Sequence, residues 1–244
     1  MSHQTVYPVP ARAASRSLLT NEQYMQMYQQ SVSEPDAFWA EHGKRLHWFT
    51  PFSKVKSTSF AAGNININWF SDGVLNASYN CLDRHLPERA DQIAYYWEGD
   101  SPDVQKTVTY AELHKQVCQL ANGMKALGVG KGDRVTIYLP MIPEATVALL
   151  ACARIGAVHS VVFAGFSPDA LGSRIVDCDS KLVITADQAL RGSRTTNLKD
   201  NTDMALAHLG DDSPVQNVIV VKHVGKNVDM NAGKDGRDVW YHEL

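Results

Sequence analysis

Residues 132–163 read GDRVTIYLPMIPEATVALLACARIGAVHSVVF, and this segment carries the clearest signal for the fold class. Arg134 to Leu139 and Val158 to Phe163 are short runs rich in Val and Ile, which is typical of buried strands. Between them, Glu144 to Ile155 is apolar over a length that favours a helix, and Gly156 follows as a stop signal. Two such strands joined by a helix predict a βαβ unit, in which the strands run parallel.

The same alternation continues towards the C-terminus. Ser167 and Pro168 form a helix start, and this helix is expected to run to Asp177. Further elements are expected in chain order: a strand at Lys181 to Ala186, an irregular basic stretch, a helix at Met204 to Leu209 and a last strand at Val218 to Val221. Parallel strands need helices on both faces, so the predicted fold class is α/β, with a doubly wound parallel sheet.

A hairpin and a long helix are expected before this sheet. Ile93 to Trp97 is a short strand candidate, and a second strand leads to Val108. Thr109 and Glu112 form a capping box ahead of an amphipathic helix that Gly128 ends.

The N-terminal part has a different character, and we divide the chain into three regions. Residues 1–19 are polar and are expected to form a flexible tail. Residues 20–84 are expected to be a loop-rich helical extension, whose two helices follow the cap candidates Thr20 and Ser33. Residues 85–244 are expected to form the α/β domain.

The composition and charge of the chain limit the kinds of partner and compartment that it is expected to have. The 244 residues carry a formal net charge of -3, so no global basic field attracts nucleic acid or anionic lipid. The sequence has no run as long as a membrane span and no apolar signal core. Its four cysteines are widely spaced and are expected to be reduced thiols. We therefore expect a cytoplasmic protein without a nucleic-acid or membrane partner.

Two loops are candidate ligand sites, because open parallel sheets bind ligands beyond the carboxyl ends of their strands. Phe163, Ala164 and Gly165 follow one strand directly, and an aromatic ring next to small residues suits a flat base. The alternative is that Phe163 belongs to the core.

The second candidate is the loop after Ala186, in which Asp187 is followed by Arg191, Gly192, Ser193, Arg194 and, further on, Lys199. Arginines three apart on a turn can converge on one phosphate. The alternative is a solvated cluster of surface charges. Together the two loops indicate a site for a nucleotide-like anion.

Five blocks of the sequence resemble the adenylate-forming acyl-CoA synthetases, and most closely the acetyl-CoA synthetase (acetate–CoA ligase) family. The blocks are YQQSVSEPDAFWAEHGKRL from Tyr28, NCLDRHLPERADQIAYYWEGD from Asn80, GDRVTIYLPMIPEATVALLACA from Gly132, ARIGAVHSVVFAGFSPDAL from Ala153 and GRDVWYHEL from Gly236. The resemblance extends from about Leu19 to Leu244. It implies the AMP-binding fold preceded by the N-terminal layer of the short-chain members.

The resemblance also implies a reaction and a site. Acetate and Mg-ATP give acetyl-adenylate and pyrophosphate, and CoA then attacks to give acetyl-CoA and AMP. The residues matching Arg191 and Arg194 hold the 3′-phosphate-ribose end of CoA in this family, and those matching Phe163 to Gly165 line its adenine. Ala164 stands where the family pattern has glycine, which weakens the expectation of a close backbone approach there.

The family's phosphate loop is expected beyond Leu244, together with most of the ATP and Mg²⁺ sites and the acetate pocket. The chain is therefore expected to be an N-terminal portion that is inactive alone and self-associates through uncovered apolar surface. A portion of a propionyl-CoA synthetase and a non-catalytic CoA-binding or interaction module are the alternatives.

Overall fold

The computed structural model describes residues 7–192, 194–230 and 236–244. The chain divides into two compact units, Met1–Val74 and Leu75–Leu244. Each unit is described by itself.

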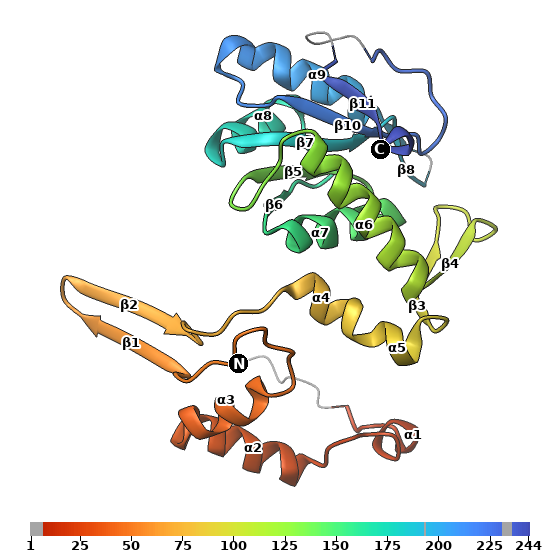
Figure 1. The fold of residues 1–244 in the computed structure, drawn as a ribbon. Helices are drawn as coiled ribbons and strands as arrows, with labels where there is room; N and C mark the ends of the chain where they lie inside the picture. The colour runs from red at the N-terminus through yellow and green to blue at the C-terminus, as the bar shows by residue number, and fades with distance from the viewer. Residues whose placement is uncertain (1–6, 193, 231–235) are drawn as a thin grey trace, which may run out of the picture. The chain divides into compact units, whose positions relative to one another are not determined.

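The first unit contains helices and one hairpin (Figure 1). Its elements are α1 (Ala11–Ala14), α2 (Asn21–Ser33), α3 (Pro35–Gly43), β1 (Lys56–Ala61) and β2 (Asn64–Trp69). The expected cap at Thr20 is confirmed, because its side chain accepts a hydrogen bond from the Gln23 amide and completes a capping box. The expected cap at Ser33 is wrong: Ser33 is the last residue of α2, and Pro35 at the first helical position begins α3.

The hairpin was not expected in what looked like a loop-rich layer. Strands β1 and β2 pair antiparallel, and Gly63 turns the chain with a φ of 75°. Nearby, the Phe52 ring packs against Trp48 and Phe70 with centroid separations of 5.1 and 4.6 Å. The aromatic residues of this unit thus pack in part against each other.

The second unit begins with short helices and a hairpin. These elements are α4 (Ala77–Cys81), η1 (Asp83–His85), α5 (Leu86–Arg89), β3 (Ile93–Glu98) and β4 (Gln105–Thr109), with β3 and β4 antiparallel. Helix α6 (Tyr110–Ala126) begins at the expected capping box, in which Thr109 and Glu112 exchange hydrogen bonds. Burial of Leu113, Val117 and Leu120 confirms its apolar stripe.

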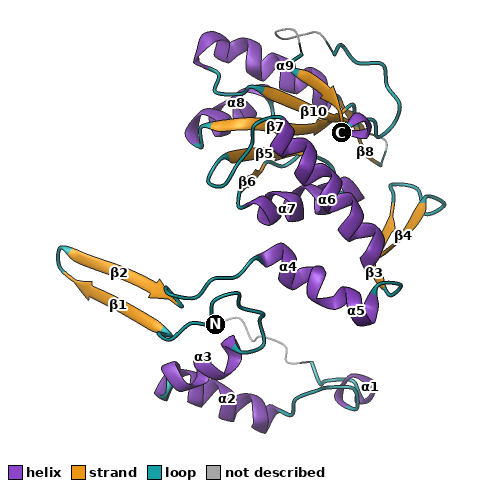
Figure 2. Cartoon of the chain, viewed as in Figure 1, coloured by secondary structure: helices purple, strands orange, loops and turns teal. Residues whose placement is uncertain are grey.

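The rest of the second unit is the parallel sheet with its crossover helices (Figure 2). In chain order these are β5 (Arg134–Tyr138), α7 (Pro143–Ile155), β6 (Val158–Val161), α8 (Pro168–Asp177), β7 (Ser180–Ala186), β8 (Ala189–Arg191), β9 (Arg194–Thr196), α9 (Leu198–Leu209), η2 (Gly210–Asp212), β10 (Asn217–Val221), β11 (Asp238–Trp240) and η3 (Tyr241–Glu243). The sheet has the order β11-β10-β7-β5-β6, and its strands pair parallel. Strand β11 was missed, because Val218 to Val221 was expected to be the last strand.

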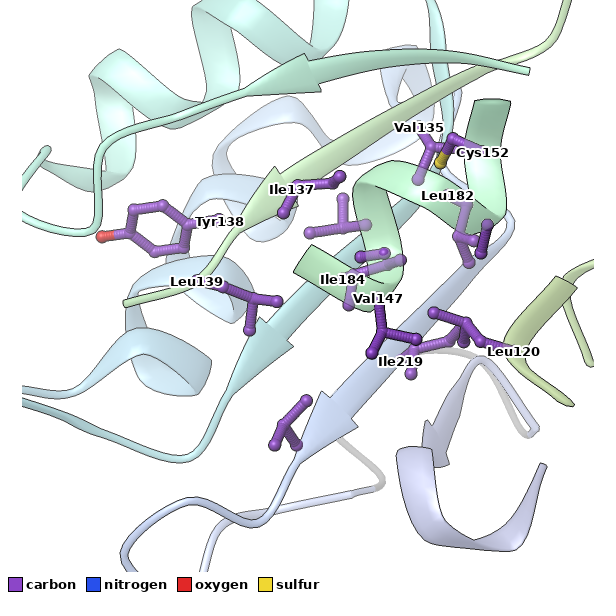
Figure 3. Close-up of a cluster of buried hydrophobic side chains, with 14 of the residues drawn as sticks. Leu120, Val135, Ile137, Tyr138, Leu139, Val147, Cys152, Leu182, Ile184 and Ile219 are labelled. Atoms are coloured by element: carbon purple, nitrogen blue, oxygen red, sulfur yellow. The ribbon is translucent and has the colours of Figure 1, made fainter. Parts of the chain in front are cut away.

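Helices cover both faces of this sheet, which confirms the doubly wound α/β fold (Figure 1). Helices α6 and α7 pack together on one face, and α8 and α9 pack together on the other. Figure 3 shows Leu120 and Val147 of the first helix pair beside Leu182, Ile184 and Ile219 of the strands. Within the described residues, none of the helices combines the length and the apolar composition that crossing a lipid bilayer requires.

Candidate functional site at the carboxyl ends of the strands

The direction in which successive strands are added to the sheet reverses at β5. The chain passes from β5 to β6 on one side and then crosses to β7 on the other side of β5. The segments that follow β6 and β7 therefore leave the same edge of the sheet and flank the end of β5. A crevice at such a switch point is where open α/β sheets bind ligands.

Phe163 lies in the segment that follows β6, and the residue is 57% exposed. The alternative that Phe163 is a core residue is therefore wrong. The backbone of Gly165 lies close to the ring, because a Cβ atom built on Gly165 would be 2.6 Å from Cε1 of Phe163. Ala164 is half-buried against the core. In its present position the Phe163 ring therefore leaves no room for a Cβ atom at position 165.

The end of this segment is tied to the strands. The Tyr138 hydroxyl donates a hydrogen bond to the Phe166 carbonyl at 2.7 Å and accepts one from the Asn201 side chain at 3.2 Å. Burial raises the pKa of Tyr138, so the hydroxyl keeps the proton that it donates. On the outer side, the Arg174 guanidinium carbon lies 4.5 Å from the centroid of the Phe166 ring.

The segment after β7 is a β-hairpin and not the irregular stretch that was expected. Strands β8 and β9 pair antiparallel, with Arg191 directly opposite Arg194. Gly192 makes the turn possible with a φ of 60°, and Ser193 lies outside the described residues. Side chains directly opposite each other lie on the same face of a hairpin, where like charges repel. The pairing thus places two exposed arginines on one face of the hairpin, and an anion bound between their side chains would relieve their repulsion.

The two predicted loops meet. The Arg191 guanidinium carbon lies 5.9 Å from the centroid of the Phe163 ring, within the range of a cation–π interaction. The turn between β8 and β9 is held by a residue of the β3–β4 loop, because the Gly192 amide donates a 2.7 Å hydrogen bond to Oδ1 of Asp100. Asp100 was missed by sequence reasoning, since nothing in the sequence links the β3–β4 loop to residue 192.

Asp187 fixes the base of the hairpin and does not line its face. The side chain is fully buried, and its carboxylate accepts hydrogen bonds from the backbone amides of five residues. The donors are Gln188, His223, Val224, Gly225 and Lys226, at 2.7 to 3.2 Å. The segments after β7 and β10 are thereby joined by one carboxylate.

Lys199 does not join the arginines. Its side chain is fully buried, and Nζ lies 2.6 Å from Asp203 and 2.9 Å from Asp238. Arg237 pairs with the same two carboxylates, so two cations and two anions form one cluster, in which Arg237 and Asp203 are partly exposed. Burial raises the pKa of Asp203, and the neighbouring Lys199 opposes that shift. Lys199 is therefore part of the buried structure and not of an anion site.

The resulting site suits an anion attached to a flat base. It offers an exposed ring, a close backbone at Gly165 and two exposed guanidinium groups on one hairpin face. Among the described residues, no group of three or more His, Cys, Asp or Glu side chains is placed to hold a metal ion.

Comparison with known proteins agrees with this fold. Over its whole length, the chain is 55% identical to the acetyl-coenzyme A synthetase of Shewanella sp. (strain MR-7), of which it spans 37%. It is 56% identical to the acetyl-coenzyme A synthetase of Brucella anthropi over 98% of the chain and 36% of that protein. The structure of an acetoacetyl-CoA synthetase from Streptomyces lividans superposes with a TM-score of 0.77 at 27% identity, over 96% of this chain and 34% of that one.

Two family models match consecutive parts of the chain. The model of the acetyl-coenzyme A synthetase N-terminus matches residues 24–81, and the model of the AMP-binding enzymes matches residues 82–241. The second match covers more than half of the chain, including the parallel sheet and both site loops. This chain belongs to the AMP-binding enzyme family.

Proposed function

We propose that this chain is part of an AMP-forming acetate–CoA ligase, which makes acetyl-CoA, AMP and pyrophosphate from acetate, ATP and CoA through acetyl-adenylate. Family membership and 55% identity to a protein named acetyl-coenzyme A synthetase support this proposal. The names of the relatives favour acetate over propionate as the acyl substrate. The chain spans about 37% of the length of such relatives, so the complete reaction belongs to the longer protein.

Within that enzyme, we propose that this chain holds the nucleotide end of CoA. The observation that carries this role is the contact of Arg191 with the Phe163 ring at the carboxyl edge of the sheet. A base stacked on Phe163 leaves its phosphorylated ribose within reach of the paired side chains of Arg191 and Arg194. Arginine binds phosphate through two parallel hydrogen bonds, which gives the 3′-phosphate both attraction and orientation.

A calorimetric titration with CoA and with dephospho-CoA tests this role. Replacing Arg191 by Ala is expected to weaken CoA binding by about tenfold or more, because a charge-assisted hydrogen bond contributes about 1.5 to 3 kcal/mol. Dephospho-CoA lacks the 3′-phosphate, so its affinity is expected to change little in the same variant. Arg89→Ala is the matched control, since Arg89 is an exposed arginine on α5. Equal losses for CoA and dephospho-CoA would contradict the assignment of the phosphate to Arg191.

We further propose that this chain alone does not form acetyl-adenylate. The adenylation step needs a cationic and metal clamp on the reacting phosphate. Among the described residues, no group of three or more His, Cys, Asp or Glu side chains is placed to supply the metal part of such a clamp. Incubation with acetate, Mg-ATP and labelled pyrophosphate should give no exchange above a blank without protein. Acetate-dependent exchange by the purified chain would contradict this proposal.

Several sequence-based expectations stay predictions. They are the domain boundaries after residues 19 and 84, the cytoplasmic location and self-association of the isolated chain. ATP and Mg²⁺ are proposed to bind mostly to residues outside this chain. Light scattering tests self-association directly, because a monodisperse monomer would contradict it.

A further inference from the structure

A cavity lies at the amino edge of the sheet, opposite the carboxyl edge that holds the CoA candidate site. It has a volume of about 520 Å³, and its lining includes Cys118, Asn122, Lys125, Lys131, Arg154 and Ile155. Lys131 precedes β5 and Ile155 ends the helix before β6, so the cavity adjoins the amino ends of these parallel strands. Its walls come from α6 and α7, which pack side by side. A volume of this size is typical of small-molecule sites.

The cavity is cationic. Its lining contains Lys125, Lys131 and Arg154 and no carboxylate. Arg154 is neutralised, because both of its terminal nitrogens lie 2.8 Å from the Asp83 carboxylate. Lys125 and Lys131 form no ion pair with any residue in the described part of the chain, and both are exposed. Two uncompensated positive charges therefore face a cavity in a chain whose net charge is negative.

A thiol lines the same cavity and has a polar neighbour. Sγ of Cys118 lies 3.5 Å from Nε2 of His114, one turn earlier on α6. The same nitrogen lies 3.2 Å from Oδ1 of Asp83 and 3.4 Å from Nη2 of Arg154. Cys118 is partly exposed, whereas Cys152 is fully buried and its burial raises the pKa of its thiol to about 12. Partly exposed cysteines beside cations are the ones that react, and buried cysteines are inert.

We propose that Cys118 is a thiol-modification site, at which the cavity takes an anionic low-molecular-weight thiol of the glutathione class as a mixed disulfide. The reaction partner is the disulfide of that thiol. Sγ of Cys118, after losing its proton, attacks one sulfur of the disulfide. A new bond forms between Cys118 and that sulfur while the original sulfur–sulfur bond breaks. The second half leaves as a thiolate and takes up the proton that Cys118 lost, and His114 Nε2 is placed to relay it.

Charge selects this class of thiol. Glutathione has two carboxylates, and the cavity that Cys118 lines is also lined by Lys125 and Lys131, without an acidic residue in the lining. A cleft lined by one sign of charge raises the local concentration of ions of the opposite sign and their rate of association. A cationic disulfide of similar reactivity, such as cystamine, meets the same field as a repulsion. The ratio of the two reaction rates therefore measures how strongly the positive charge of the cavity acts at Cys118.

The test uses the 244-residue chain in which Cys81→Ser and Cys178→Ser leave only Cys118 and the buried Cys152. Mixed-disulfide formation with oxidised glutathione and with cystamine is followed by intact mass spectrometry and located by peptide mapping. We expect modification at Cys118, with oxidised glutathione reacting about tenfold faster than cystamine at low salt. Lys125→Gln with Lys131→Gln should bring the two rates within about threefold of each other. Raising the salt concentration should have the same effect.

Two controls separate an effect of the folded cavity from an effect of the substitutions themselves. The same rate ratio read at Cys118 of the unsubstituted chain by peptide mapping does not depend on the serine variants folding. In strong denaturant the preference for glutathione should disappear, because the cavity that holds the lysines and the thiol together no longer exists. Equal rates for the two disulfides at Cys118 of the folded chain would overturn the proposal. So would an unchanged ratio in the double lysine variant.

Discussion

The guanidinium carbon of Arg191 lies 5.9 Å from the centroid of the Phe163 ring, although the two residues follow strands that are not neighbours. Phe163 follows β6, Arg191 is in the hairpin after β7, and β5 lies between these strands. The contact therefore spans the switch point of the sheet. It brings a surface for a base and a group for a phosphate to one place, which is the arrangement that a nucleotide needs.

A substitution at Gly165 tests whether the position of the Phe163 ring matters for CoA binding. In Gly165→Ala the new Cβ would be 2.6 Å from the Phe163 ring, so the ring must move. We expect CoA affinity to fall by about fivefold, which corresponds to about 1 kcal/mol. The melting temperature should change little, because the exposed ring can rotate into solvent. Ala164→Gly, which adds no atom, is the control in calorimetric titrations, and a Gly165→Ala variant with unchanged CoA affinity would contradict the role of the ring.

The pairing of Arg191 with Arg194 predicts that their effects on CoA binding are not additive. If both hold one phosphate, the double variant should lose less affinity than the sum of the single Ala variants, by about 0.5 kcal/mol or more. With dephospho-CoA this coupling should vanish. A double-mutant cycle by calorimetry measures both quantities. Additive losses for CoA would mean that the two arginines act on separate groups.

Replacing Asp187 is predicted to lower the stability of the fold strongly. Asp187→Ala removes the acceptor of five backbone amides in a fully buried position. We expect the free energy of unfolding to fall by on the order of 3 kcal/mol, because five amides lose a charged acceptor that is itself fully buried. Urea unfolding followed by circular dichroism measures this change. Asp91→Asn, at an exposed position, is the control and should stay within about 0.5 kcal/mol of the parent chain. A similar small effect for Asp187→Ala would contradict the role of its carboxylate.

Asp72 makes the first unit sensitive to acid. The Ser53 hydroxyl and the Ser53 amide, in that order, lower the pKa of Asp72 from 3.8 to about 2. A lowered pKa in the folded state stabilises the fold above the ordinary pKa. That stabilisation is lost as the pH falls from about 4 through about 2. A carboxyl-carbon NMR titration should give Asp72 a pKa of about 2, and Ser53→Ala should raise it. A value near 3.8 in the parent chain would contradict this network.

The sequence predicted the parallel sheet well because its strands are short apolar runs with helix signals between them. Thr109, Gly156 and Ser167 mark helix ends through local capping, which depends on neighbouring residues only. Strand β11 could not be found in this way. It has three residues, and it is a strand only because it pairs with β10.

The candidate site was predicted in part. Its two loops followed from the rule that ligands bind at strand ends, and their contact is a property of the strand order. The hairpin β8–β9 had a local signal that went unused, since Gly192 and Ser193 separate two short runs as a tight turn does. Lys199 had no such signal, because Asp238 and Arg237, which complete its buried charge cluster, lie far away in the sequence.

The most direct measurement is an NMR titration of the arginine side-chain Nε–H signals with CoA. If the nucleotide end of CoA binds where the β6 and β7 loops meet, the signals of Arg191 and Arg194 should shift together along one saturation curve, while that of Arg89 stays in place. With dephospho-CoA the two shifts should shrink. If CoA binds and the Arg191 and Arg194 signals do not move, the site at this edge of the sheet is contradicted.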